Sequence, residues 1–215
     1  MDGAAVQGYV DYGYAKAASF IGETYKQFRP SGSLPATGLS NYLGTITAYV
    51  DPGVNFPADN PRPFGKALLK TVVDPSAVLP GDYLVGSSRT YFISSIQPLQ
   101  PVLSVYTNDV VTVERSETPD QSGLLPYGGE RRSTMTTILT SWPASVLLKG
   151  KKEKNPTGLG SDTPQTEMEI LLPPNAPAIL PGDILLTETG GKRYVAENVE
   201  ISDLGFRIRA TEVIT

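Results

Sequence analysis

The sequence predicts a mainly β protein in which two tandem small β-barrel or sandwich modules follow an N-terminal α-helix. The first observation is a repeat: the tetrapeptide Leu-Pro-Gly-Asp occurs within residues 79–95 and again within 180–197. Each copy continues with a short apolar strand, a glycine-containing hairpin and a strand that begins with tyrosine, and such self-similarity is typical of duplicated modules. The second observation is composition, since 21 glycines and 19 prolines favour many short strands joined by turns.

The repeated tetrapeptide is a turn signal. Proline presets φ at the first central position of a turn, and glycine supplies the positive φ that the second position requires. An aspartate that follows accepts hydrogen bonds from nearby backbone amides, so turn capping is favoured over catalysis for both aspartates. The predicted structural turn residues are Pro80, Gly81 and Asp82 in the first copy and Pro181, Gly182 and Asp183 in the second.

Residues 1–40 are predicted to form a helix and a linker arm. Within 4–21 the apolar residues recur at helical spacing and draw one stripe along the helix. Its members are Val6, Val10, Tyr14, Ala17 and Ile21. Gly22 is a candidate C-cap, followed by an extended segment over 23–29 and a linker rich in Ser, Gly and Pro over 30–40. The stripe needs a partner, and its own barrel or another subunit fits equally well.

The first β module is expected over 41–116. Residues 42–50 and 64–74 read as strands because apolar or β-branched residues dominate them. The segment 51–63 between them contains four prolines and is expected to leave the barrel as a long loop. The turn unit at 79–95 and an alternating run at 102–115 complete the module.

A polar linker is expected over 117–133, and the second module over 134–215. Its strands are predicted at 134–149, 166–172 and 206–215 around the turn unit, with an edge or bulge at Trp142-Pro143. The loop of this module carries Lys149, Lys151, Lys152 and Lys154. These lysines are a candidate contact for DNA or for an acidic partner, and a solvated loop tip is the simpler interpretation.

The amino-acid composition excludes several kinds of catalytic and metal-binding site. There is no cysteine and no histidine, so thiol nucleophiles, zinc clusters and the usual near-neutral proton shuttle are excluded. No phosphate-binding or dinucleotide motif occurs, and we expect no catalytic, cofactor-binding or metal-binding residues and no enzymatic activity. A net charge of −4 argues against coating nucleic acid. We expect no signal peptide and no apolar run that spans a membrane.

The helix, the segment Tyr25–Pro30 and the barrels with their Pro-Gly-Asp turns resemble one family. Pro80-Gly81-Asp82 with Tyr91, and Pro181-Gly182-Asp183 with Tyr194, are similar to elements of tailed-bacteriophage head–tail joining (neck) proteins, the stopper, gateway and collar components of the virion. These residues cover about a third of the chain. The single-barrel stoppers lack the duplication.

The resemblance implies a structural virion protein that is assembled in the host cytoplasm into a cyclic homo-oligomer. The ring would join the portal or adaptor side of the capsid to the tail tube or its terminator, and duplex DNA would pass through without sequence recognition. The stripe at Val6, Val10, Tyr14 and Ile21 would then lie between subunits. The alternative is a carbohydrate- or peptide-binding β module on a phage tail or cell surface, which exposed aromatic residues on one barrel face would favour.

Overall fold

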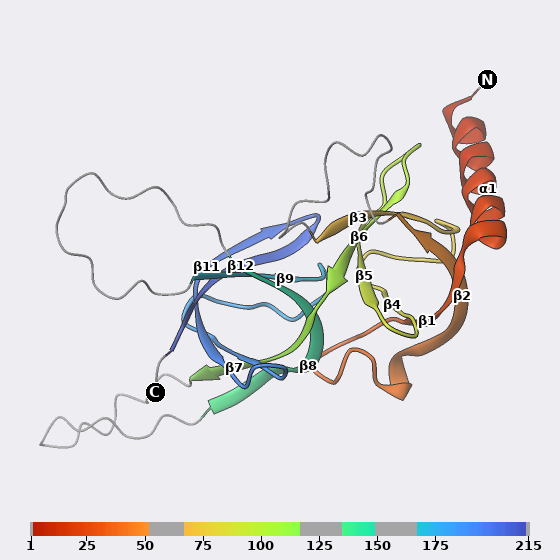
Figure 1. Cartoon of the computed structure of the whole chain (residues 1–215). Helices are drawn as coiled ribbons and strands as arrows, with labels where there is room; N and C mark the ends of the chain where they lie inside the picture. The colour runs from red at the N-terminus through yellow and green to blue at the C-terminus, as the bar shows by residue number, and fades with distance from the viewer. Residues whose placement is uncertain (1, 52–66, 117–134, 149–166, 214–215) are drawn as a thin grey trace, which may run out of the picture.

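The computed structural model describes residues 2–51, 67–116, 135–148 and 167–213. It confirms the predicted class: one N-terminal helix precedes two antiparallel β-barrels of six strands each. The barrels lie side by side, with the helix at the outer end of the first barrel (Figure 1).

The first barrel closes in the order β1-β2-β3-β6-β5-β4. Every neighbouring pair is antiparallel, and β1 joins β4 to complete the circle. Its strands are β1 (Glu23–Phe28), β2 (Tyr42–Val50), β3 (Leu68–Val72), β4 (Tyr83–Val85), β5 (Thr90–Ser95) and β6 (Val102–Thr107).

The second barrel repeats this arrangement strand for strand, since it closes as β7-β8-β9-β12-β11-β10. All six pairs are again antiparallel, and β7 joins β10 where β1 joins β4 in the first barrel. Its strands are β7 (Asp109–Ser116), β8 (Met135–Leu148), β9 (Glu167–Leu172), β10 (Ile184–Thr187), β11 (Arg193–Ser202) and β12 (Gly205–Glu212).

The strand pairing places the module boundaries differently from the expected 41–116 and 134–215. Strand β1 lies within the predicted arm but belongs to the first barrel, and β7 belongs to the second barrel rather than the first. The boundary between the barrels falls at Asn108, between β6 and β7. It was not predicted because residues 102–115 read as one continuous run. The Asn108 side chain accepts a hydrogen bond from Val146 N at 2.7 Å and donates one to Val146 O at 2.8 Å. It thereby fixes the start of the second barrel against β8.

Two apolar cores hold the molecule. The interior of the first barrel is small and contains Tyr25, Leu84 and Ile93 among its buried residues. The interior of the second barrel is continuous with residues on the outside of the first, including Phe28, Tyr83 and Phe92. The two barrels therefore share this second core and pack as a single unit.

Helix α1 (Gly3–Ile21) ends at Gly22, as predicted, and Gly22 N donates a hydrogen bond to Ala18 O at 2.8 Å. The helix packs against β2 and β3, and Ala18 is its one buried residue. Gly22 is a tight position, because a Cβ there would lie 2.4 Å from Ala18 O. The arm after β1 ends in a 3-10 helix, η1 (Leu39–Asn41).

Candidate functional site

The two Pro-Gly-Asp turns have the same geometry, and in each the aspartate accepts a hydrogen bond from a backbone amide of the turn. In the first, Asp82 N donates to Leu79 O at 3.0 Å and the Asp82 carboxylate accepts from Leu79 N at 2.9 Å. In the second, Asp183 N donates to Leu180 O at 3.1 Å and the carboxylate accepts from Leu180 N at 2.8 Å. Gly81 and Gly182 have φ of 96° and 94°, which explains the glycine at this position.

Each turn aspartate also forms a bidentate ion pair with an arginine, a partner that the sequence analysis did not predict. Arg29 donates from Nε and Nη2 to Asp82 at 2.7 and 2.8 Å, and Arg115 donates to Asp183 at 2.8 Å from both nitrogens. The carboxylate side chains are only 1% and 2% exposed. The hydrogen bond to its aspartate raises the pKa of each arginine further, so both guanidinium groups stay charged.

Each ion pair joins two parts of its barrel. Arg29 follows β1 and Arg115 lies near the end of β7, so each pair ties the first strand of a barrel to the turn before the fourth. The arginine and the aspartate are 53 residues apart in the first copy and 68 in the second. A search for residues that repeat at one fixed spacing therefore misses the two arginines. The sequence feature that could have identified both pairs is an arginine at the end of the first strand of each barrel.

The junction between the barrels is built on Tyr83 and Trp142. Their rings meet edge to face with centroids 6.2 Å apart, and both side chains are fully buried. The Tyr83 hydroxyl donates to Pro143 O at 2.8 Å, and Trp142 Nε1 donates to Leu34 O at 2.8 Å. Both polar atoms at the end of an otherwise apolar contact are therefore satisfied.

The arm between β1 and β2 crosses from the first barrel to the second. Ser33 O accepts from Thr140 N at 2.9 Å, and Asn175 Nδ2 donates to Pro30 O at 3.1 Å. Ala36 is completely buried in the shared core. The stretch read from sequence as a linker is thus part of the packing between the barrels.

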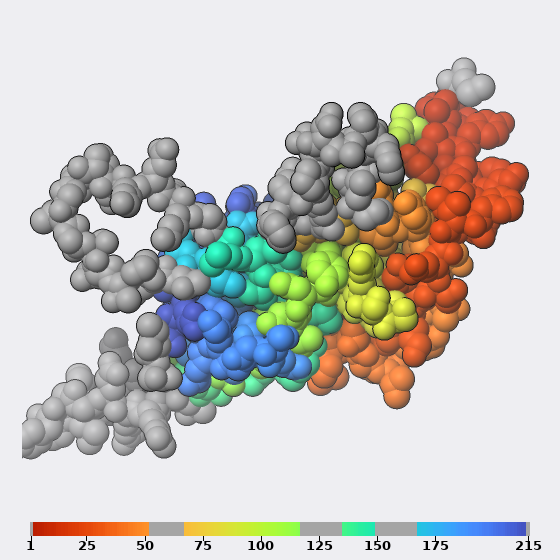
Figure 2. Space-filling view, viewed as in Figure 1, coloured from red at the N-terminus to blue at the C-terminus, as the bar shows by residue number. Residues whose placement is uncertain are grey.

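The outward face of α1 is the most exposed aromatic surface among the described residues. Tyr9, Tyr12 and Phe20 are 71%, 66% and 78% exposed, and with Lys16 they lie on one side of the helix. Figure 2 shows the helix projecting from the outer end of the first barrel. Exposed apolar residues gathered in this way mark interaction surfaces.

The stripe predicted to mediate subunit contact lies mainly elsewhere on the helix. Val6, Val10 and Tyr14 are half-buried on the side toward the barrel, and Ile21 is exposed at the C-terminal end. Spacing alone located an apolar stripe correctly. It missed the aromatic face, because Tyr9, Tyr12 and Phe20 fall outside the pattern.

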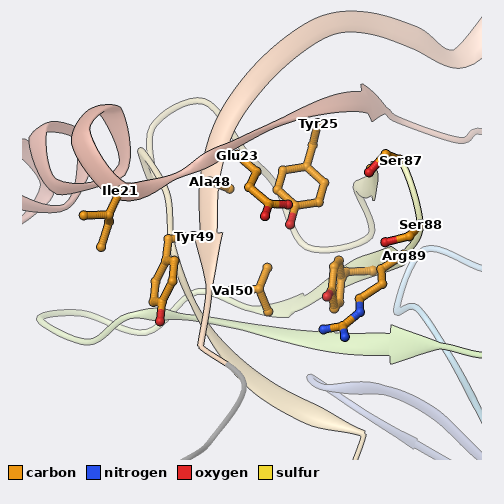
Figure 3. Close-up of a pocket in the computed structure, with 11 residues that line it drawn as sticks. Ile21, Glu23, Tyr25, Ala48, Tyr49, Val50, Ser87, Ser88 and Arg89 are labelled. Atoms are coloured by element: carbon orange, nitrogen blue, oxygen red, sulfur yellow. The ribbon is translucent and has the colours of Figure 1, made fainter.

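A depression of about 340 Å³ lies beside the end of α1, between β1, β2 and the β4–β5 hairpin. Figure 3 shows Glu23, Tyr25, Tyr49 and Arg89 lining it. Burial, followed by the nearby Tyr91 and Glu23, raises the pKa of Tyr25 to about 12. The rings of Tyr25 and Tyr91 contact each other edge to face at 6.0 Å and are buried. They therefore offer no open platform for stacking a sugar.

The remaining predicted contacts cannot be placed. Lys149, Lys151, Lys152 and Lys154 lie outside the described residues, as does the 117–133 linker. Within the described ranges, no group of three or more Asp or Glu side chains is arranged to hold a metal ion. No helix in the described part of the chain is long and apolar enough to cross a membrane.

Comparison with known proteins adds no relative: no protein family, curated protein or solved structure matches the chain.

Proposed function

We propose that this protein is a structural component of the neck of a tailed bacteriophage, which assembles into a ring at the head–tail junction. The ring joins the portal or adaptor side of the capsid to the tail tube or its terminator and surrounds the DNA channel. The proposal combines the resemblance carried by the turns and Tyr25–Pro30 with the surface of α1.

The observation that carries it is the exposed aromatic face of α1. Helix α1 packs on its barrel through its other side, so Tyr9, Tyr12 and Phe20 gain nothing from that packing. Each exposed aromatic side chain is worth about 1.5–3 kcal/mol when it is fully buried. Association with a further surface provides that burial.

The closed barrels restrict how the association occurs. Because each barrel is closed, neither has an edge strand, although the end of β11 beyond Val195 pairs with β12 alone. Side-chain surfaces are therefore the main route to assembly, and α1 supplies one. A net charge of −4 is consistent with a channel wall along which DNA slides without strong binding.

A ligand-binding β module is the second candidate, favoured by the depression lined by Glu23, Tyr49 and Arg89. It ranks lower because the rings of Tyr25 and Tyr91 are buried.

The test is the mass of the purified chain by light scattering and native mass spectrometry, with electron microscopy of the particles. We expect a ring of one defined stoichiometry. A protein that stays monomeric at all concentrations contradicts the ring.

A second test addresses the neck itself. Inactivating the gene in the phage or prophage that encodes it should leave DNA-filled heads and complete tails unjoined, as seen by electron microscopy of the lysate. Normal virions from the inactivated phage contradict the neck role even if the chain forms a ring.

A further inference from the structure

The exposed side of α1 is a single line of side chains, which we call the α1 outer face. It consists of Ala5, Tyr9, Tyr12, Lys16 and Phe20, which follow one another at steps of four, three, four and four residues. Residues at this spacing lie along one side of a helix, and all five are exposed. The helix packs on β2 and β3, so the outer face points away from its own barrel.

Little within the described part of the chain stabilises α1. Its N-cap residue, Asp2, makes no side-chain capping hydrogen bond, and Ala18 is its one buried residue. Gly8 and Gly13 lie within the helix, where glycine is unfavourable. A Cβ at either glycine would meet nothing among the described residues within 4 Å. The helix therefore has open space beside its outer face and would gain stability from a surface that covers it.

The sizes of the side chains on the outer face complement one another when the helix is reversed. Consider two copies of α1 that lie antiparallel, with Tyr12 of each level with Gly13 of the other. Phe20 of each copy is then level with Ala5 of the other. Both aromatic rings thus meet a small residue, which allows the close approach that packed helices need.

The charge on the outer face favours the same antiparallel arrangement. In this register Lys16 of each copy is level with Tyr9 of the other. An ammonium group over a tyrosine ring is attracted by the ring, and the symmetric contact contains this pair twice. A parallel pair would instead bring Lys16 against Lys16, and like charges placed together oppose association.

The exposed area is of the size that a small specific interface requires. Tyr9, Tyr12 and Phe20 are 71%, 66% and 78% exposed. Together they offer roughly 300–500 Å² on each copy, to which Ala5 and the stem of Lys16 add. A standard interface buries about 800 Å² on each partner, and weak complexes bury less. Because each helix has its barrel on the opposite side, the two barrels lie on the outer sides of the helix pair.

We propose that two copies of the chain associate through an antiparallel, two-fold pairing of their α1 outer faces. The contact is isologous and is complete with two copies, so a ring needs a further contact between pairs. The inference goes beyond the proposed ring, because it names what covers α1 and predicts an even number of chains in every particle.

The absence of cysteine from the chain allows a direct test by disulfide crosslinking. Ala5→Cys and Phe20→Cys chains are purified separately, mixed and oxidised, and we expect a crosslinked dimer from the mixture. A chain with both substitutions should stop at a dimer on a denaturing gel, because a two-fold contact links each cysteine to its counterpart within one pair. A ladder of higher multiples indicates a head-to-tail contact and overturns the proposal.

The direction of the helices is tested by each single variant alone. In the antiparallel pair, Ala5 of one copy lies about 22 Å along the axis from Ala5 of the other, too far for a disulfide. Ala5→Cys alone should therefore give little dimer, and a dimer that it forms readily shows parallel pairing and overturns the proposal. Leu39→Cys, at a residue of the arm that is 92% exposed, replaces Phe20→Cys in the control mixture.

A matched pair of variants provides a readout without crosslinking. Tyr12→Glu places a charge at the centre of the outer face, and Leu39→Glu places one at the exposed residue of the arm. We expect Tyr12→Glu to weaken pairing about tenfold or more in sedimentation equilibrium, as loss of a central aromatic residue does. Leu39→Glu should leave it unchanged, and circular dichroism checks that both variants fold. Equal association of the two variants contradicts the pairing.

The outcomes separate this pairing from the proposed ring. A wild-type chain that forms the crosslinked dimer and nothing larger supports the pairing and contradicts the ring. A ring that forms equally well from a folded Tyr12→Glu variant contradicts the pairing while the proposed function stands. If both are right, Tyr12→Glu should halve the number of chains in each particle, as native mass spectrometry will measure.

Discussion

Arg29 donates two hydrogen bonds, of 2.7 and 2.8 Å, to Asp82 beside the pairing of β1 with β4 that closes the first barrel. Only three residues of β1 pair with β4 there, and the ion pair extends this short contact to the preceding turn. Arg115 and Asp183 do the same where β7 meets β10. The two barrels therefore close with the same ion pair and the same turn.

Removing the arginine from each seam should destabilise the protein to different extents. In Arg29→Met, the Asp82 carboxylate keeps Gln27 Nε2 at 2.8 Å and Leu79 N at 2.9 Å as donors. In Arg115→Met, Asp183 retains the Leu180 amide. We expect Arg115→Met to lower the free energy of unfolding by about 3 kcal/mol, the cost of a buried charge without its partner, and Arg29→Met by less. Urea denaturation measures both.

The control for these variants is Arg207→Met, because Arg207 pairs with Glu169 at 2.9 Å at a more exposed position. Its loss should cost less than about 1 kcal/mol. Equal effects of Arg115→Met and Arg207→Met would show that burial of the aspartates adds nothing.

The two turn glycines form a second matched pair. Gly182→Ala should cost about 1–3 kcal/mol, because alanine is strained at a φ of 94°. Gly81→Ala should cost more, because its Cβ would also lie 2.3 Å from Asn175 Cγ. In an Asn175→Ala background the cost of Gly81→Ala should fall to that of Gly182→Ala. A double-mutant cycle measured by thermal or urea unfolding checks this, and strict additivity would contradict it.

The junction hydrogen bond can be tested with Tyr83→Phe. The change removes the donor to Pro143 O while the ring and its contact with Trp142 remain. The buried carbonyl loses this donor, so we expect a loss of about 1–3 kcal/mol in the free energy of unfolding. Tyr12→Phe on the exposed face of α1 is the control and should have no measurable effect on monomer stability.

The shared core predicts that both barrels unfold together. Trp142 is the one tryptophan of the chain and lies at the junction, so its fluorescence reports on the contact between the barrels. The fluorescence transition should coincide with that of far-ultraviolet circular dichroism, which follows all strands. Two separated transitions would show that the barrels are independently stable.

Alkaline pH should weaken the fold through Tyr25. Its pKa is about 12 in the folded protein and 10.0 when unperturbed. Above pH 10.0 the unfolded chain loses a proton that the folded chain retains, so stability falls with rising pH. The contribution is complete below pH 10.0 and is lost as the pH rises to about 12. Tyr25→Phe should make this fall less steep, as urea denaturation across the range will measure.

The elements of the fold were largely predictable from sequence, because turns and alternation are local signals. The strand 42–50 and the helix over 4–21 agree with β2 and α1 within a residue. The division between modules was not predictable in the same way. Residues 102–115 contain no proline or glycine that would mark a break, and the boundary appears only in the strand pairing and in the long-range bonds of Asn108 to Val146.

The ion pairs and the exposed face of α1 were harder to predict than the helix and strands, because they depend on tertiary structure. The sequence identified Asp82 and Asp183 as turn residues, and nothing local pointed to Arg29 and Arg115 as their partners. The exposed face of α1 was missed for a related reason. Periodicity locates an apolar stripe, whereas the exposure of Tyr9 and Phe20 depends on how the helix is set against the barrel.

The wall formed by Phe28, Tyr83 and Phe92 makes the first barrel dependent on its neighbour. A fragment that ends at Asn108 would expose these three aromatic side chains to water and should aggregate. The two barrels should therefore be expressed and engineered as one inseparable piece.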